Sequence, residues 1–563
     1  MSLAQRIRTR RTEARELREE AAQLAFLRPH PDHLSNGEEL EYRRPSPPAG
    51  NGGLSYIANH SKSLPHNRFG EVNQRAYRAL LRALHSGNPD HFQEIPLGRG
   101  IRSVRLINPQ AGFAFDLEGP DAQAVTVPPA PRIDGAENSA EMGELYWMAL
   151  LHDVSFIDYG TGANTDAGPI NTAAAADSLS TEFSVFKGPK VGTPPVVTPA
   201  TLFRGFARGD LEGPYLSQFL LKGTADPVLN PPPDNGIIGY GTLGIDQKQR
   251  TVVSGLDYLT AFADWLAVQD GEDRRGTDTF DPTPRFIRNL RDLGSYVHYD
   301  ALYEAYLNAC LLLLRMPARL DPGNPYVDPV RGHGRTQDGF GTFGGPHILS
   351  LVTEVATRAL KAVWYQKWSV HRRLRPEEFG GRIQVHRTED PGRYPMIDNE
   401  ILNSSVVPIV ENQFGSALLP QAFPEGSPTH PAYGAGHATV AGACVTILKA
   451  WFDESDAFDP ALAPATNPLL QENRRPKVPD AAGTALVDFT GPGLLTVGGE
   501  LNKLAANIAI GRNGAGVHWR SDYTESVKLG EQIAIGILQE QKATYLEDHH
   551  LSLTKFDGTA III

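Results

Sequence analysis

Three segments in the second half of the chain place basic or imidazole side chains where helices are expected to begin or end. They are "KWSVHRRLRP" (367–376), "HPAYGAGHA" (430–438) and "GRNGAGVHWRSD" (511–522). Cations and free backbone N–H groups at helix ends are typical of sites that bind oxyanions. Each segment also has a purely structural interpretation. Only the three segments together favour an oxyanion site over that interpretation.

The first segment carries Lys367 and Arg375, eight residues apart. On a continuous helix that spacing leaves them about 80° apart and two turns along the axis. Both are therefore expected to reach one group beside the helix end, where Pro376 stops the helix. The alternative is a solvated basic face, because other basic residues lie between them: His371, Arg372 and Arg373.

The second segment is expected to start a helix near His437, after small residues that let the backbone approach a bound group closely. Free N–H groups and the positive end of the helix dipole would face that group. The alternative is an ordinary glycine-rich helix start with a capping or buried histidine.

The third segment places Arg512 at or just beyond the C-terminus of an apolar helix. His518 follows a flexible Asn-Gly-Ala-Gly link, and Asp522 is four residues further along. That spacing puts His518 and Asp522 on one helical face, where the carboxylate can orient the imidazole. The alternative is a helix terminus neutralised by Arg512 and a structural His–Asp pair.

Taken together, the cations Lys367, Arg375 and Arg512, a helix N-terminus and two or three histidines describe a cage for a multiply charged tetrahedral oxyanion. No cysteine-rich or carboxylate-rich cluster in the sequence competes as a divalent metal site. The sequence therefore predicts an anion site built from helix ends.

A chain of 563 residues, 40% hydrophobic and 21% charged, is expected to fold into two closely packed domains or one very large helical domain. We expect a mainly α fold with two packed helical bundles joined by long loops. Residues 1–270 would form an N-terminal helical region with Pro/Gly loops, 271–284 a linker, and 285–563 a bundle carrying the site. Long helices are expected at 285–316, 344–375, from about 437, at 498–512 and at 521–542.

The net charge and the distribution of apolar residues argue against some classes of binding partner. A net charge of −12 argues against nucleic acid, and no apolar run reaches the roughly 18 residues of a membrane span. The charged N-terminus lacks the apolar centre of a signal peptide, which predicts a soluble protein, cytoplasmic by default. Cys310 and Cys444 lie in apolar runs and are interpreted as buried residues, with one disulfide between them left open.

At this point the motifs resemble a known family. The order Lys-x7-Arg-Pro, Gly-His opening a helix, and Arg-x5-His-x3-Asp is similar to the vanadium-dependent haloperoxidases, whose site is shared with the type 2 phosphatidic acid phosphatases. "FGTFGGPHILSLVTEVATRALKAVWYQKW" and "VHRRLRPEEFGGR" resemble the bromoperoxidase branch in particular. Further similarity runs through "NHSKSLPHN", "ELYWMALLHDVSF" and "YVHYDALYEAYLNACL", and so covers most of the chain.

The resemblance implies a vanadate cofactor. It also implies that phosphate can occupy the same site when vanadium is absent. It implies that Lys367, Arg375, Arg512 and the Gly436 N–H hold the vanadate oxygens and that His518, next to Asp522, is the metal ligand. His437 would be the acid/base group and Lys367 would polarise bound peroxide. The halide approach would be formed by two further residues, Trp364 and His430.

The resemblance also implies a function and a doubt. The protein would oxidise bromide, or chloride, with hydrogen peroxide to a hypohalous species that halogenates small organic acceptors, and it would form homodimers or larger homo-oligomers. The family's serine is replaced here by Ala435. This replacement removes a hydroxyl donor whose hydrogen bond is worth on the order of 1 kcal/mol. It puts the affinity for vanadate and the rate of the reaction in doubt. A phosphatase using the same cage, or a non-catalytic oxyanion-binding protein, remains the alternative.

Overall fold

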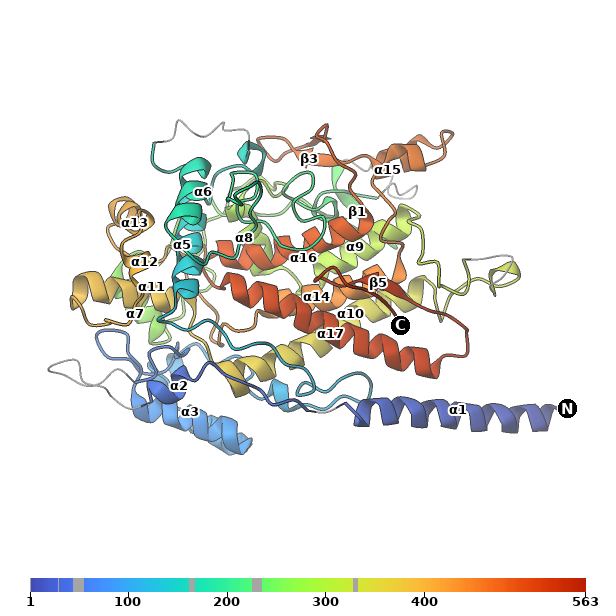
Figure 1. Ribbon diagram of the computed structural model, residues 1–563, viewed down its shortest axis with the longest axis horizontal. Helices are drawn as coiled ribbons and strands as arrows, with labels where there is room; N and C mark the ends of the chain where they lie inside the picture. The colour runs from blue at the N-terminus through green and yellow to red at the C-terminus, as the bar shows by residue number, and fades with distance from the viewer. Residues whose placement is uncertain (1, 29, 44–54, 161–167, 225–234, 328–332) are drawn as a thin grey trace.

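The structure is a computed structural model that describes residues 2–28, 30–43, 55–160, 168–224, 235–327 and 333–563. Regular structure in these ranges is mostly helical, which confirms the predicted mainly α class (Figure 1). The helices, in chain order, are α1 (Leu3–Phe26), α2 (Glu38–Glu41), α3 (Gln74–Ser86), α4 (Pro89–Gln93), α5 (Ala136–Leu150), α6 (Thr172–Thr181), α7 (Phe262–Gln269), α8 (Leu290–Tyr299), α9 (Glu304–Arg315), α10 (Gly345–Tyr365), α11 (Pro376–Gln384), α12 (Asn399–Leu402), α13 (Val406–Phe414), α14 (Gly436–Trp451), α15 (Pro468–Arg474), α16 (Val497–Gly514) and α17 (Arg520–Thr544).

Strands within the described ranges form only small antiparallel pairs. These are β1 (Ile237–Tyr240) with β2 (Leu243–Asp246), β3 (Lys477–Pro479) with β4 (Leu486–Asp488), and β5 (Ser552–Thr554) with β6 (Ala560–Ile562). None of these pairs contributes a residue to the predicted site.

Helix α14 is the centre of the molecule and packs against α17, α10 and α16. Every residue of α14 except His437 is buried, as expected for a helix that is apolar on all sides. Small residues allow the close crossing with α17, because a Cβ on Gly442 would lie 2.0 Å from the carbonyl oxygen of Val527. A substitution there would separate the helices that carry the two ends of the site.

The expected helix 344–375 is wrong beyond Tyr365. α10 ends at Tyr365, a π-helical segment follows over Gln366–His371, and Arg372 adopts a left-handed conformation with φ 43°. A new helix, α11, then begins with Pro376 at its first position, where the missing N–H of proline costs no hydrogen bond. Lys367 and Arg375 therefore do not share a helix, and Pro376 starts a helix instead of ending one.

Two other helical expectations also need correction. The segment 285–316 is two helices, α8 and α9, because the chain turns into an extended conformation at Asp300 (ψ 144°). α16 ends at Gly514, so Arg512 lies in its last turn, at the helix C-terminus as expected. His518 precedes α17 whereas Asp522 lies in the first turn of α17, so the two are not on one helical face.

The main apolar core includes residues from Ile57 to Phe556, on both sides of segment 271–284. The division into residues 1–270 and 285–563 stays a prediction. Cys310 and Cys444 are buried and free, which confirms their interpretation as core residues and excludes the disulfide.

Helix α1 projects from the body of the molecule (Figure 1). None of its residues is buried, and the chain after it is fixed to α17 by Arg28, which donates to Glu540 Oε1 (3.0 Å) and to the carbonyl of Gly536 (3.0 Å). Among the described helices, none combines the length and the hydropathy needed to cross a membrane.

Candidate functional site

The ends of α8, α10, α14 and α16 meet around a cavity of about 270 Å³. Its lining includes many of the residues predicted from the sequence: Trp364, His430, Gly436, His437, Arg512 and His518. Lys367, Arg375 and Asp522 are fully buried directly beside them. The structure thus brings every predicted site residue together, although the helices that carry them differ from expectation.

Lys367 is held by the loop before α14. Its Nζ donates to the carbonyl oxygens of Pro431 (2.8 Å) and Ala432 (3.1 Å). Burial, with a smaller contribution from neighbouring Arg375, lowers the pKa of Lys367 well below its ordinary value. A bound anion would oppose this shift, because negative charge favours the protonated amine.

Arg375 joins the two histidines that lie on either side of it. Its Nη1 donates to His518 Nε2 (2.9 Å) and its Nη2 to His430 Nδ1 (2.9 Å), while Nε donates to the carbonyl of His430 (2.9 Å). Burial lowers the pKa of Arg375 to about 9, which still leaves the guanidinium charged at neutral pH. Both imidazoles are therefore fixed by one cation.

The two ring nitrogens of His518 have different partners, Asp522 at Nδ1 and Arg375 at Nε2. Nδ1 lies 2.8 Å from Asp522 Oδ2, and since a carboxylate accepts hydrogen bonds, Nδ1 carries the proton. Burial first, and then the charges of Arg375 and Lys367, lower the pKa of His518 well below its ordinary value. The neutral ring thus has its lone pair on Nε2, where it accepts the hydrogen bond from Arg375 Nη1 (2.9 Å). Neutral imidazole is the form that ligates metals, and a metal bound at Nε2 would replace that hydrogen bond.

His437 is held by a residue that sequence reasoning missed. Its Nε2 lies 3.1 Å from Oδ1 of Asp300, the residue that ends α8. Burial lowers the pKa of His437, although the charge of Asp300 opposes the shift. Nδ1 remains available as a base, and the His437 side chain is 18% exposed, whereas Asp300 is 3% exposed. A single aspartate after a helix has no local pattern that marks it as functional.

Trp364 and His430 form one wall of the cavity, with ring centroids 4.8 Å apart. Because His430 Nδ1 accepts a hydrogen bond from Arg375, the proton of the neutral imidazole lies on Nε2. Burial lowers the pKa of His430 well below its usual value, and Lys367 adds to the effect. This wall is therefore uncharged and aromatic.

The N-terminus of α14 is open toward the cavity. Its N-cap residue, Ala435, makes no side-chain cap, and among the residues that the structure describes no acceptor is recorded for the N–H groups of Gly436 and His437. A Cβ on Gly436 would lie 3.2 Å from Trp364 Cζ3, so a larger residue would press against the ring. These donors form the kind of cradle that binds anions.

The charges around the cavity fit an anion. Lys367, Arg375 and Arg512 are all buried, and within the described ranges none of them forms an ion pair with a carboxylate. Arg512 Nε is also buried without a hydrogen-bond partner. Buried, unpaired cations are costly, so a bound oxyanion would stabilise them. The same described residues contain no cluster of acidic, histidine and cysteine side chains suited to a bare metal ion.

A second missed residue, Glu378, supports Arg375 from behind. Glu378 accepts hydrogen bonds from the backbone N–H of Arg375 (2.7 Å) and of Ser61 (2.9 Å) and pairs with His60 Nδ1 (2.9 Å). Burial alone would raise its pKa, but His60 and these donors outweigh burial and hold the pKa at about 2. The segment "NHSKSLPHN" thus lies directly behind the site.

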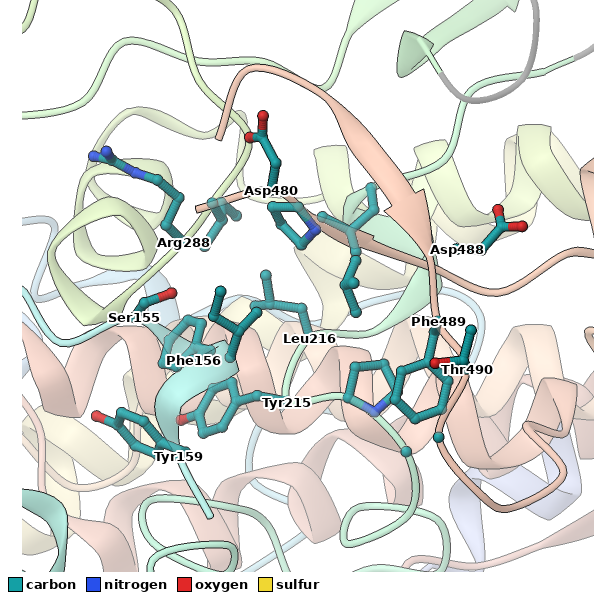
Figure 2. Close-up of a pocket in the computed structure, with 18 of the residues that line it drawn as sticks. Ser155, Phe156, Tyr159, Tyr215, Leu216, Arg288, Asp480, Asp488, Phe489 and Thr490 are labelled. Atoms are coloured by element: carbon teal, nitrogen blue, oxygen red, sulfur yellow. The ribbon is translucent and has the colours of Figure 1, made fainter. Parts of the chain in front are cut away.

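Another cavity, of about 370 Å³, lies away from these residues. Figure 2 shows the rings of Phe156, Tyr159 and Tyr215 grouped on one side of it. Its Arg288 is paired with Asp292 (2.7 Å), so this guanidinium is already neutralised. The cavity contains none of the predicted site residues and lacks the converging free cations of the first one.

Comparison with known proteins agrees with this geometry. The domain family described as the VCPO second helical-bundle domain matches residues 348–545. The vanadium-dependent bromoperoxidase of Corallina officinalis is 41% identical over 618 residues, covering 100% of this chain and 99% of that protein. The vanadium-dependent bromoperoxidase of Corallina pilulifera is also 41% identical, with 96% of each chain covered.

A solved structure shows the same architecture. The homohexameric structure of the second vanadate-dependent bromoperoxidase (AnII) from Ascophyllum nodosum matches with a TM-score of 0.81 and 27% sequence identity. The match covers 100% of this chain and 91% of that one. Near-complete coverage at 41% identity shows common descent of the whole chain, which therefore belongs to the vanadium-dependent bromoperoxidase family.

Proposed function

We propose that this protein is a vanadate-dependent haloperoxidase that oxidises bromide with hydrogen peroxide and so halogenates small organic acceptors. Bromide, hydrogen peroxide and one proton give hypobromous acid and water. The observation that carries the proposal is the set of three buried cations without carboxylate partners, which lie beside a helix N-terminus and the unprotonated Nε2 of His518. The relatives named as bromoperoxidases support bromide over chloride.

The residues divide the work of holding the cofactor. Lys367, Arg375 and Arg512 would bind vanadate oxygens as charged donors, with the Gly436 N–H adding a fourth contact, and His518 Nε2 would be the metal ligand. Vanadate, when bound, supplies a Lewis-acid centre for peroxide activation. Lys367, buried beside the residues that line the cavity, can withdraw charge from an oxygen next to it.

His437 is suited to handle the proton. Asp300 fixes its Nε2–H, so Nδ1 can take a proton from hydrogen peroxide entering the cavity and later return it. Because its pKa is lowered, His437 is neutral near pH 7 and begins each cycle as a base. Trp364 and His430 would form the surface along which the halide approaches.

A phosphatase is the second candidate, because phosphate and vanadate share shape and charge and would use the same cage. Asp522 fixes His518 with Nε2 unprotonated, the arrangement that a histidine nucleophile also needs. Phosphate occupying the site without vanadium is part of this alternative.

The test compares both activities in one preparation. The protein, freed of bound anion and reloaded with vanadate, should brominate a phenol dye only when bromide and hydrogen peroxide are both present. Lys367→Met should abolish this activity, whereas Lys187→Met, at an exposed residue paired with Glu137, should not. Absence of bromination in the loaded protein, together with phosphate release from an aryl phosphate, would overturn the proposal.

We also propose that the chain forms a homo-oligomer. Support comes from the exposed helix α1, which has no buried residue in one chain, and from the AnII relative, which is homohexameric. Leu3, Ile7 and Phe26 are among the exposed apolar residues of α1 that a second copy could cover.

A further inference from the structure

Arg512 has fewer hydrogen bonds than the other cations of the site. In the part of the chain that the structure describes, its guanidinium makes one recorded hydrogen bond, from Nη1 to the carbonyl of Val297 (2.8 Å). Nε is buried with no partner. Arg375, in contrast, uses all three of its nitrogens. Hydrogen bonds therefore do not fully determine where Arg512 points, and packing must supply the rest.

The packing partner of Arg512 is the ring of Phe423. The guanidinium carbon lies 5.2 Å from the ring centroid, within the range of a cation–π contact. Phe423 is 2% exposed and forms a small apolar cluster with Ala422, Ala515 and Val517, beside the link that carries His518. The Phe423 ring thus bounds one side of the space that the Arg512 guanidinium can occupy.

Phe423 is in turn stacked on His298, with centroids 3.8 Å apart and an interplanar angle of 20°. His298 lies in the last turn of α8, and its Nε2 is 2.8 Å from Glu425 Oε1. His298, Phe423, Glu425 and Arg512 all line the same cavity. A carboxylate, an imidazole, a phenyl ring and a guanidinium therefore follow one another in contact along its wall.

We propose that the His298–Glu425 pair is a positioning pair, which acts through Phe423 to hold the Arg512 guanidinium in the orientation that binds the oxyanion. This inference rests on the proposed function. The contacts of the pair lead to Arg512 through the Phe423 ring, so its effect is on the pre-organisation of Arg512. A cation held in place before the anion binds loses less conformational freedom on binding than a mobile one.

The electrostatics of the pair agree with this role. Burial alone would raise the pKa of Glu425, but the hydrogen bond and charge of His298 outweigh it and hold the pKa below its usual value. Burial lowers the pKa of Arg512 to about 10, and the charges of Asp300 and Glu425 oppose that shift. An ionised Glu425 thus also helps Arg512 to remain charged inside the cavity.

The experiment measures vanadate binding directly. The dissociation constant for vanadate is determined by equilibrium dialysis with vanadium analysis for the wild-type protein and for His298→Ala, Phe423→Leu, Glu425→Ala and Glu425→Gln. His298→Ala, Phe423→Leu and Glu425→Ala should weaken binding about tenfold, the lower end of the loss seen when residues supporting a metal ligand are removed. Glu425→Gln keeps an acceptor for His298 and should restore most of the affinity.

A double variant distinguishes a common route from general damage. If His298 acts through Phe423, the His298→Ala/Phe423→Leu protein should bind vanadate no more weakly than the worse single variant. The control is His347→Ala, at the opposite end of the 21-residue helix α10, which should leave the dissociation constant unchanged. Thermal unfolding midpoints confirm that each variant is folded.

Three outcomes would overturn the inference: unchanged vanadate affinity in folded His298→Ala, full additivity in the double variant, or no recovery in Glu425→Gln. A fall in kcat at saturating vanadate with unchanged affinity would also overturn it, since the pair would then act on the chemistry. If the wild-type protein binds phosphate but no vanadate, that result would instead contradict the proposed function.

Discussion

At the scale of single residues, the two histidines either side of the turn before α14 have different surroundings and should have different roles. His437 is linked to a carboxylate, Asp300, and keeps Nδ1 free, whereas His430 is linked to a cation, Arg375, and lies against Trp364. We expect His437→Ala to lower kcat/KM for hydrogen peroxide by about 100-fold, the usual minimum for a lost acid/base group. His430→Ala should chiefly change KM for bromide.

Steady-state rates with peroxide and bromide varied in turn, at saturating vanadate, check this division. Asp300→Asn should reproduce a part of the His437→Ala defect, because it removes the partner of Nε2 but leaves the ring. Equal losses in both kinetic constants for the two histidine variants would contradict separate roles.

Ala435 stands where the resemblance to the family leads us to expect a serine, and it invites the reverse substitution. It is the N-cap of α14 with an extended backbone (φ −80°, ψ 126°), a conformation in which a serine hydroxyl normally caps the helix. Ala435→Ser should tighten vanadate binding about fivefold, corresponding to a hydrogen bond of about 1 kcal/mol. Equilibrium dialysis checks the prediction. Ala441→Ser, in the same buried helix, is the control, and equal affinities in both variants would refute the idea.

The convergence of Lys367, Arg375, Arg512 and the histidines could be predicted, because each lies in a segment with a recognisable pattern of charge and small residues. Asp300 and Glu378 could not. Their partners, His437 and Arg375, are supplied by tertiary packing, and neither acidic residue has a local spacing that marks it. Sequence patterns thus identify the residues that would contact the anion more readily than the residues that hold them in place.

At the scale of elements, the positions of helices were predictable but their interruptions were not. The apolar pattern of 344–375 continues through the π-helical segment because the side chains of Trp368 and Val370 still face the core. The π-helical segment ends at a tertiary contact, where the carbonyl of Arg372 accepts a hydrogen bond from His60 N–H (2.9 Å). The break frees Arg375 to cap α11 and turns its side chain toward the cavity.

The π-helical segment ends in a histidine that should make the protein sensitive to acid. Both ring nitrogens of His371 are buried, and neither has a hydrogen-bond partner among the residues that the structure describes. Burial lowers the pKa of His371 to about 3. The unfolded chain, with a histidine pKa near 6.5, then binds the proton first as pH falls, so stability is lost from about pH 6.5 downward. His371→Phe should reduce the loss of unfolding free energy between pH 7 and pH 5 by about 2 kcal/mol.

Urea unfolding at the two pH values measures the difference. His85→Gln, at an exposed position near the end of α3, serves as the control and should behave as the wild type. The same pH dependence in His371→Phe and wild type would show that His371 is not the group responsible.

At the scale of the whole molecule, α1 is the element that one chain leaves unexplained. This 24-residue helix packs on α17 along one side, where Leu17 and Leu24 are half-buried, and none of its residues is fully buried in the monomer. Because packing of an apolar face supplies most of the stability of a helix in water, we expect a further contact to stabilise α1. We therefore expect a chain lacking residues 1–27, which retains Arg28 and its contacts with α17, to fold and to bind vanadate normally but to form smaller assemblies. Light scattering after size-exclusion chromatography gives the mass of each assembly.

A milder variant, Leu3→Glu with Ile7→Glu, removes exposed apolar side chains without shortening the chain. It should shift the assembly in the same direction, whereas Arg8→Glu should not. An unchanged mass for the shortened chain would mean that α1 is stabilised by something other than a second copy.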